Sequence, residues 1–466
     1  MHQLDRHAGQ SKTPAFRHRS SLQLFTARRT PRQGVKAATV VTHASTTPHK
    51  AHTTERPKIK QTPTHDGCEV YVDADGAVVP VMCVDYGFRS GFGRLNQGID
   101  GEIPKNIVSL GWDNYKMEFR QLRKSFRVDE YQAFAPPSPN PLRKVFNTIS
   151  LSFVKSLASL DVKLEEAGLL SKLEPDPVPE EVLNDDGEPI EAYKEMRAKL
   201  AKLRLDNAAV WEREHRREAT PGWVAHEAPW PIRAAYLSIC WVMDVIYDRR
   251  PIQRFWFLEV VARMPYFSYI SMLHLYESLG WWRAGAELRK VHFAEEWNEI
   301  HHLMIMESLG GDQLWIDRFM AQHAAVFYYW VLIGFFAFSP SLAYVFSEMV
   351  EGHAVDTYTQ FVEDNAELLK SIPPPLIALQ YYKGEDLYYF DALQTAGDIQ
   401  ERRRPTCNNL YDVFTNIKGD EEEHVKTMTA CRDYSIVDDL AKRKKALSRP
   451  GSKAGSSNSV PDPTAS

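Results

Sequence analysis

Residues 293–307, FAEEWNEIHHLMIME, place a glutamate and a histidine three positions apart inside an apolar helical pattern. Glu299 and His302 share one helix face, because residues three apart lie about one turn from each other. A carboxylate and an imidazole on an otherwise apolar face lose hydration when they are buried, and a metal ion or a hydrogen-bonding partner is the usual compensation. This stretch therefore predicts a ligand-bearing helix inside a helical core.

A second pair with the same spacing, Glu421 and His424, lies in the last helical pattern of the chain. Two Glu-x-x-His helices, together with one glutamate from each of two further helices, form the dinuclear site of ferritin-like bundles. Glu259 is an isolated acid in the apolar residues 252–279, and Glu351 directly follows another apolar run. We therefore predict an all-α fold, a ferritin-like four-helix bundle with a diiron carboxylate site plus additional membrane-associated helices. The candidate metal ligands are Glu259, Glu299, His302, Glu351, Glu421 and His424.

The residue types of this set favour iron. Four carboxylates neutralise two divalent ions, and their hard oxygens stabilise the oxidised iron that oxygen chemistry needs, whereas zinc favours more nitrogen or sulfur ligands. A buried polar network without metal is the alternative, and for any single residue it explains the pattern better. The complete set on four predicted helices favours two iron ions.

A third Glu-x-x-His pair, Glu212 and His215, has a different setting. It lies in a highly charged pattern, residues 191–217, that we predict to be one helix. We interpret the pair as a coincidence on a solvated surface, where neither side chain needs a metal. The charged neighbours behind this interpretation are Arg213, Glu214, Arg216 and Arg217.

The composition excludes several classes of protein. A net charge of -5 on 466 residues favours no nucleic-acid partner. Five scattered cysteines without a C-x-x-C pair indicate neither a disulfide framework nor a zinc or iron–sulfur site. Residues 1–50 carry nine Lys or Arg and one acid, which is typical of an organelle transit peptide, with a disordered basic tail as the alternative.

The rest of the chain divides by composition. An Asp-Gly turn within residues 69–81 predicts a hairpin, residues 142–173 predict an amphipathic helix, and the acidic, proline-rich residues 174–181 indicate a linker. The predicted segments are therefore 1–50, the transit peptide; 51–229, a divergent region with the linker and the charged helix; 230–432, the diiron catalytic domain; and 433–466, a disordered tail.

Two apolar stretches suggest contact with a membrane. Residues 230–246 are too short to span a bilayer, which needs about 20 apolar residues, so we expect them to lie in the interface. Residues 319–347 contain no Asp, Glu, Lys or Arg, but Ser339-Pro340 interrupts them. Either they span the membrane, or the first part lies on it and the second enters the bundle. We favour the second, monotopic arrangement.

Several longer motifs resemble a known family. Residues 258–267 (LEVVARMPYF), 276–282 (YESLGWW), 293–311 and 409–414 (NLYDVF) are similar to the plastid terminal oxidases, the chloroplast branch of the alternative oxidases. Residues 371–386 resemble a segment that marks this branch. The resemblance covers roughly residues 230–431. It implies a non-haem diiron plastoquinol:oxygen oxidoreductase that reduces dioxygen to water, attached monotopically to the stromal side of the chloroplast thylakoid membrane, in chlororespiration and in support of carotenoid desaturation.

The resemblance also implies roles for individual residues. The family's iron ligands fall on the six nominated positions, and its redox-active tyrosine falls on Tyr358, seven residues after Glu351. Implied partners are plastoquinol, dioxygen, the lipid surface and a second copy in a homo-oligomer. A phenylalanine, Phe336, stands where these enzymes carry a tyrosine. His301 beside the ligand His302 points elsewhere on the helix and is expected either to support the ligands from behind or to be structural. The implied quinol-binding positions are Arg254, Leu258, Ala354 and Thr357.

Two other functions fit the same residues. A membrane-bound diiron hydroxylase or desaturase acting on a lipid or a quinone ring would use the same ligands but insert oxygen or form a double bond. A membrane-surface scaffold would need no metal in its core. Iron content separates the scaffold from the enzymes, and product analysis separates the oxidase from the hydroxylase.

Overall fold

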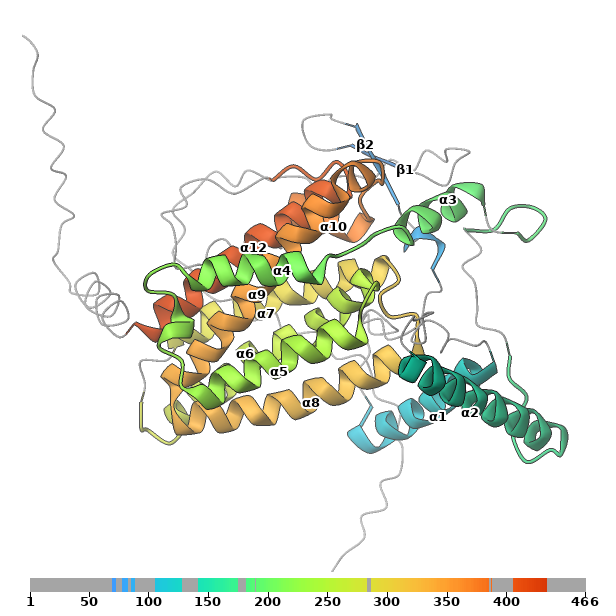
Figure 1. Cartoon of the computed structure of the whole chain (residues 1–466), viewed down its shortest axis with the longest axis horizontal. Helices are drawn as coiled ribbons and strands as arrows, with labels where there is room; N and C mark the ends of the chain where they lie inside the picture. Colours follow the sequence, from blue (N-terminus) through green and yellow to red (C-terminus); the bar gives the residue numbers. More distant parts are fainter. Residues whose placement is uncertain are drawn as a thin grey trace, which may run out of the picture. The chain divides into compact units, whose positions relative to one another are not determined.

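A computed structural model describes residues 69–72, 78–82, 85–88, 105–127, 141–174, 182–188, 190–282, 286–384, 387 and 405–433. The predicted transit peptide, and the predicted tail beyond residue 433, lie outside these residues. Within them the chain is helical apart from one two-stranded hairpin, so the all-α prediction is confirmed (Figure 1).

Four long helices form the core: α6 (Pro251–Ser278), α7 (Ala286–Ser308), α9 (Pro340–Lys370) and α12 (Leu410–Arg432). Helix α6 packs along α7, and α9 packs along α12. Between the two pairs, side chains of all four helices meet. The sequence therefore places its four ligand-bearing patterns on the four helices of one bundle.

Local sequence signals set the ends of these helices. Pro251 occupies the first turn of α6, where its missing N–H is not needed. The predicted interruption at Ser339-Pro340 ends α8 (Trp315–Phe338) and starts α9, because the Ser339 side chain accepts a hydrogen bond from the Leu342 N–H. Asn409 caps α12 in the same way, through the N–H of Asp412.

Helices α5 (Trp230–Ile246) and α8 pack on the bundle, α5 against α9 and α8 mainly along α6 but also against α9, and both share one apolar cluster with α9 (Figure 1). Their outer faces are apolar and exposed. Trp230 and Trp241 on α5 are 80% and 64% exposed, and Phe327 and Trp330 on α8 are 72% and 65% exposed. Among the described helices, α8 alone is long and apolar enough to cross a membrane, a test that the core helix of a soluble protein can also pass.

The N-terminal part adds smaller elements. The predicted hairpin is present as the antiparallel strands β1 (Glu69–Val72) and β2 (Val78–Val81). Met82 then bonds through its backbone to Pro374 and Leu376, at the start of α10 (Leu376–Lys383). Helices α1 (Ile107–Arg127) and α2 (Pro141–Glu166) are joined by an ion cluster of Arg123 and Arg127 with Asp161 and Glu165. The short 3-10 helices are η1 (Asp85–Gly87) and η4 (Val224–His226).

The prediction of one helix over residues 191–217 was wrong. The structure has α3 (Glu191–Leu200) and α4 (Asn207–Glu218) with a break between them. Side chains of α9 cause the break by bonding the intervening backbone. Asn365 receives a hydrogen bond from the Arg204 N–H and donates one to its carbonyl, and Asp364 accepts from the Asp206 N–H. These bonds replace the intrahelical ones.

Candidate metal centre

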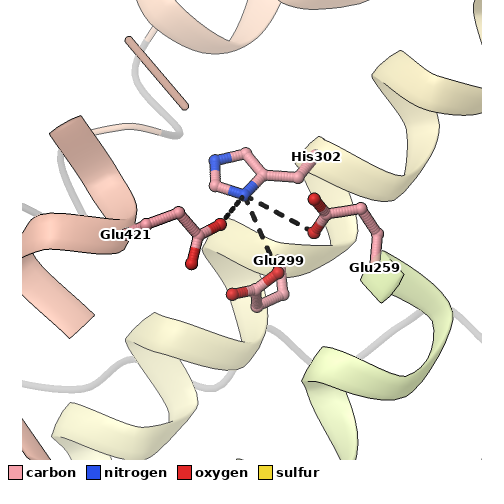
Figure 2. Close-up of side chains that lie close together, drawn as sticks. All are labelled: Glu259, Glu299, His302 and Glu421. Carbon is pink, nitrogen blue, oxygen red and sulfur yellow. Dashed lines mark ion pairs between the residues drawn. The ribbon is translucent and has the colours of Figure 1, made fainter. Parts of the chain in front are cut away.

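The six side chains nominated as metal ligands meet inside the bundle. Glu259 comes from α6, Glu299 and His302 from α7, Glu351 from α9, and Glu421 and His424 from α12. None is more than 3% exposed. Figure 2 shows four of them, with His302 facing Glu259, Glu299 and Glu421. Burying so many ionisable groups requires compensation within the site.

The six residues form two overlapping sets of four. Each set offers ligand atoms that lie within 4.8 Å of one another. The first set is Glu259, Glu299, His302 and Glu421, and the second is Glu299, Glu351, Glu421 and His424. Glu299 and Glu421 belong to both. The arrangement thus provides two adjacent cation positions, each with one histidine and one outer glutamate of its own, and two shared carboxylates between them.

The distances show how closely the groups converge. His302 Nδ1 lies 3.4 Å from Glu421 Oε1 and 3.7 Å from both Glu259 Oε2 and Glu299 Oε2. His424 Nδ1 lies 3.0 Å from Glu299 Oε1 and 3.4 Å from Glu421 Oε2. An ion between such atoms would replace nitrogen-to-oxygen contacts with nitrogen-to-metal and oxygen-to-metal bonds.

Two observations show that metal ions fit this donor set. Within the described part of the chain, Glu259 Oε2, both Glu299 oxygens and His302 Nδ1 are buried and have no hydrogen-bond partner. Burial, followed by repulsion from Glu299, raises the pKa of Glu259 well above its usual range. Burial and the charge of Glu421 do the same to the pKa of Glu351. The two outer carboxylates, Glu259 and Glu351, thus lack nearby positive charge, which two cations would supply.

Two tyrosines connect α6 and α9 reciprocally at the outer glutamates. Tyr358 on α9 donates a hydrogen bond to Glu259 on α6, and Tyr266 on α6 donates one of 2.7 Å to Glu351 on α9. Both are buried, and Tyr358 stacks on Phe255 with ring centroids 4.3 Å apart. The sequence analysis missed Tyr266, although it follows Glu259 by seven residues, the same spacing that separates Tyr358 from Glu351.

A second network holds His302 from the side away from the site. His302 Nε2 lies 3.1 Å from Asp420 Oδ2. The same oxygen accepts hydrogen bonds from Tyr382, at 2.9 Å, and from the amide of Asn298, at 3.1 Å. Asn298 also donates to Tyr381. A partner on the far ring nitrogen fixes the orientation of a ligand histidine, so the Tyr381-Tyr382 segment of α10 contributes to the site. The sequence analysis did not identify Asp420 or Asn298.

His301 lies in the same region but faces away from the ligands. Its ring stacks on Tyr381, with centroids 4.2 Å apart, and its Nδ1 lies 2.7 Å from the Trp297 carbonyl. These contacts agree with the expected structural role. Phe336 is buried and packs against Tyr269. The hydroxyl of Tyr269 hydrogen-bonds to the Ala343 carbonyl and to the Ser347 hydroxyl.

The four implied quinol-binding positions lie on α6 and α9, the two helices that carry the outer glutamates Glu259 and Glu351. Arg254 and Thr357 are buried, while Leu258 and Ala354 are half-buried. Arg254 and Thr357 both contact His353: Arg254 Nη2 lies 3.4 Å from His353 Nε2, and the Thr357 hydroxyl donates to the His353 carbonyl. The structure therefore connects the two buried positions through a residue that the sequence analysis did not name.

The third Glu-x-x-His pair is exposed, as predicted. Both Glu212 and His215 point to solvent on α4. The interpretation of their neighbours was wrong in part, because Glu214 is buried and Arg217 is half-buried with an ion pair to Asp356. A charged helix can present charge on both of its faces when other helices supply partners for the inner one.

Comparison with known proteins gives the following similarities. Residues 220–433 match the family described as alternative oxidase. The chain is 53% identical over 209 residues to ubiquinol oxidase 4, chloroplastic/chromoplastic, of Arabidopsis thaliana, which covers 43% of this chain and 59% of that protein. It is 27% identical over 198 residues to ubiquinol oxidase 1b, mitochondrial, of Oryza sativa subsp. japonica, covering 42% of this chain and 51% of that protein.

The match is therefore confined to the helical bundle and its covering helices. The chain spans between half and two thirds of the length of these two relatives. No solved structure matches. Helices α1 to α4 lie outside the matched residues.

Proposed function

We propose that this chain is a non-haem diiron plastoquinol:oxygen oxidoreductase that oxidises plastoquinol and reduces dioxygen to water. The match of residues 220–433 to the alternative oxidase family supports the proposal. The observation that carries the proposal is the pair of overlapping buried ligand sets with two shared carboxylates. The similarity to a chloroplastic relative favours plastoquinol over the quinols of other membranes, and a chloroplast location.

The proposed ligands are Glu259 and His302 for one iron, Glu351 and His424 for the other, and Glu299 and Glu421 for both. Two iron ions bound there would supply the electron transfer between quinol and dioxygen. The chain itself keeps water out of the site, since all six ligands are buried. It also fixes His302 through Asp420 and orients the two outer glutamates through their tyrosine hydroxyls.

Tyr358 is the proposed redox-active residue. It is buried, and it donates its hydroxyl hydrogen to a ligand, Glu259. Burial and the nearby Glu259 carboxylate raise the pKa of Tyr358 well above its usual range, so the phenol keeps its proton at neutral pH. If it gives up an electron, the proton has an acceptor already in place at Glu259.

The proposed quinol site consists of Arg254, Leu258, Ala354 and Thr357. Leu258 directly precedes the ligand Glu259, and Thr357 directly precedes Tyr358. A quinol bound there would lie beside both the outer ligand and the proposed redox-active tyrosine. Arg254 and Thr357 supply polar groups, and Leu258 supplies apolar surface, the combination that small-molecule sites use.

We further propose monotopic attachment to the stromal side of the thylakoid membrane through α5 and α8. The exposed tryptophans of α5 and the exposed tryptophan and phenylalanines of α8 support this. The polar groups of the bundle stay among protein neighbours in this arrangement. In that position the enzyme would serve chlororespiration and carotenoid desaturation. Two copies of the chain could associate through another face, which would leave the membrane-facing sides of α5 and α8 in contact with lipid.

The experiment that tests the proposed function is oxygen uptake by the purified, iron-loaded chain with a short-chain plastoquinol analogue. Quinol-dependent uptake with the quinone as the only organic product supports the oxidase. An oxygenated quinone or lipid product would favour the hydroxylase or desaturase instead. A chain that contains no iron and consumes no oxygen would favour the scaffold.

A further inference from the structure

Helix α4 presents a polar inner face to the bundle. Asn207, Trp211 and Glu214 are spaced four and three residues apart, so they lie on one face, opposite the exposed Glu212. Each makes a hydrogen bond to a residue of α5, α6 or α9. The matched family residues begin at 220, after α4 ends at Glu218, so the family match says nothing about this helix.

Asn207 and Trp211 hold Arg254 from one side, Asn207 directly and Trp211 through Asp244. Arg254 Nη1 donates to Asn207 at 3.0 Å and to Asp244 on α5 at 2.6 Å. Trp211 in turn donates its indole N–H to the other oxygen of Asp244, at 2.7 Å. The guanidinium is 1% exposed, so these partners, and not water, set its direction.

Glu214 fixes the residue on the other side of the guanidinium. One oxygen of Glu214 lies 2.8 Å from His353 Nδ1, and the other accepts a hydrogen bond of 2.6 Å from Tyr236. Glu214 is 2% exposed. His353 Nε2 faces the Arg254 guanidinium, and Nδ1 on the opposite side of the ring faces the Glu214 carboxylate. Glu214 thereby sets the orientation of this ring.

Helix α4 approaches α9 closely at this point. A Cβ built on Gly352 would lie 2.4 Å from Arg217 Nη1 and 2.8 Å from the Trp223 ring. Gly352 lies between Glu351 and His353, and Arg217 is paired with Asp356 one turn further on. Gly352 therefore leaves room for the Arg217 and Trp223 side chains beside the stretch of α9 that bears Glu351, His353 and Thr357.

We propose that Glu214 is a positioning residue for quinol binding. It holds His353, which contacts Arg254 through its ring and Thr357 through its carbonyl, and these are the two buried positions of the proposed quinol site. The inference rests on the proposed function. The sequence suggested that α4 is a solvated helix. The inference instead gives α4 a role in holding the residues of the proposed quinol site in place.

The test compares Glu214→Leu and Glu214→Gln with the matched variants Glu212→Leu and Glu212→Gln in the full-length, iron-loaded chain. Glu212 is on the same helix and exposed, so its variants control for changes to α4 in general. Oxygen uptake is measured against the concentration of a short-chain plastoquinol analogue and, separately, against dioxygen. Bound iron is measured on every variant.

Glu214→Leu should raise KM for the quinol about tenfold, as expected when a buried polar group loses its partner. Its kcat, its KM for dioxygen and its iron content should change by less than about twofold, because no proposed ligand is touched. Glu214→Gln keeps an acceptor oxygen and should recover most of the wild-type quinol KM. Both Glu212 variants should match the wild type.

An unchanged quinol KM in Glu214→Leu, or a loss of kcat and iron in proportion to unfolded protein, would overturn the inference. If Glu214→Leu does not fold, Tyr236→Phe takes its place, because it removes the hydroxyl that bonds Glu214. An unchanged quinol KM in Tyr236→Phe, with wild-type kcat and iron content, would overturn the inference as well. A wild-type chain that consumes no oxygen with quinol would refute the proposed function itself, and this inference with it.

Discussion

Replacing the shared carboxylate of Glu299 should remove both metal ions. Glu299 is fully buried, belongs to both ligand sets, and lies 3.0 Å from His424 Nδ1 and 3.7 Å from His302 Nδ1. One unit charge contact at about 4 Å is worth about 4 kcal/mol at an effective dielectric constant of about 20. The Glu299→Ala variant loses such a contact with each of two cations, so each should bind at least about 10³-fold more weakly.

Metal analysis of the purified variants measures this directly. The wild-type chain should retain two iron ions per molecule through a desalting column, and Glu299→Ala should retain essentially none. His424→Ala should also lose iron retention, because it removes the only histidine of one set. Glu212→Ala, an exposed member of the third Glu-x-x-His pair, should keep the wild-type content. Equal iron contents in all three variants would refute the assignment of the ligands.

Four further outcomes follow from the structure. Tyr358→Phe should lower kcat at least about tenfold with iron retained, whereas Tyr266→Phe should weaken iron binding about 10- to 100-fold. Oxygen-uptake rates and iron titrations separate the two effects. Identical effects of the two variants would contradict their different roles. Gly352→Ala should destabilise the fold by about 1–3 kcal/mol in a urea titration, because the added methyl group overlaps Arg217 and Trp223, and an unchanged free energy of unfolding would contradict this. Replacing Trp241 and Trp330 with serine should reduce sedimentation with anionic lipid vesicles, and unchanged sedimentation would exclude α5 and α8 as the attachment. The iron-free chain should lose thermal stability as the pH rises above 4.5, the ordinary pKa of a glutamate side chain. The reason is that burial and neighbouring charges raise the pKa of both outer glutamates in the folded state, so the folded chain holds protons that the unfolded chain releases. A melting temperature that rises with pH over this range would contradict the prediction.

The sequence specified the bundle because each ligand helix has its own local signal. Glu299 and His302, like Glu421 and His424, lie three residues apart in apolar surroundings, and such a pattern has few other physical explanations. The helix ends were also readable, since Ser339-Pro340 both ends α8 and caps α9. The helix ends could not be predicted where tertiary contacts determine them. Nothing in residues 191–217 shows that the Asn365 side chain hydrogen-bonds the backbone N–H and carbonyl of Arg204.

The parts of the site that were missed depend on contacts between helices. Asp420 follows a glycine and precedes three glutamates, so its role in orienting His302 is not visible before α7 and α12 are packed together. Glu214 is one of several charged residues in a row, and only the position of α9 distinguishes it from Glu212. Tyr266 was the exception, because its spacing from Glu259 repeated a pattern already in use.

The stoichiometry of oxygen consumption tests the central claim most directly. Dioxygen takes four electrons to become water and each quinol gives two, so we predict one dioxygen consumed per two quinols oxidised, read with an oxygen electrode and quinone absorbance on the same sample. Added catalase should release no oxygen, and cyanide should not inhibit, because it prefers softer haem and copper centres to a carboxylate-rich iron site. A ratio of one dioxygen per quinol with oxygen returned by catalase would mean that peroxide is the product, and would contradict the account.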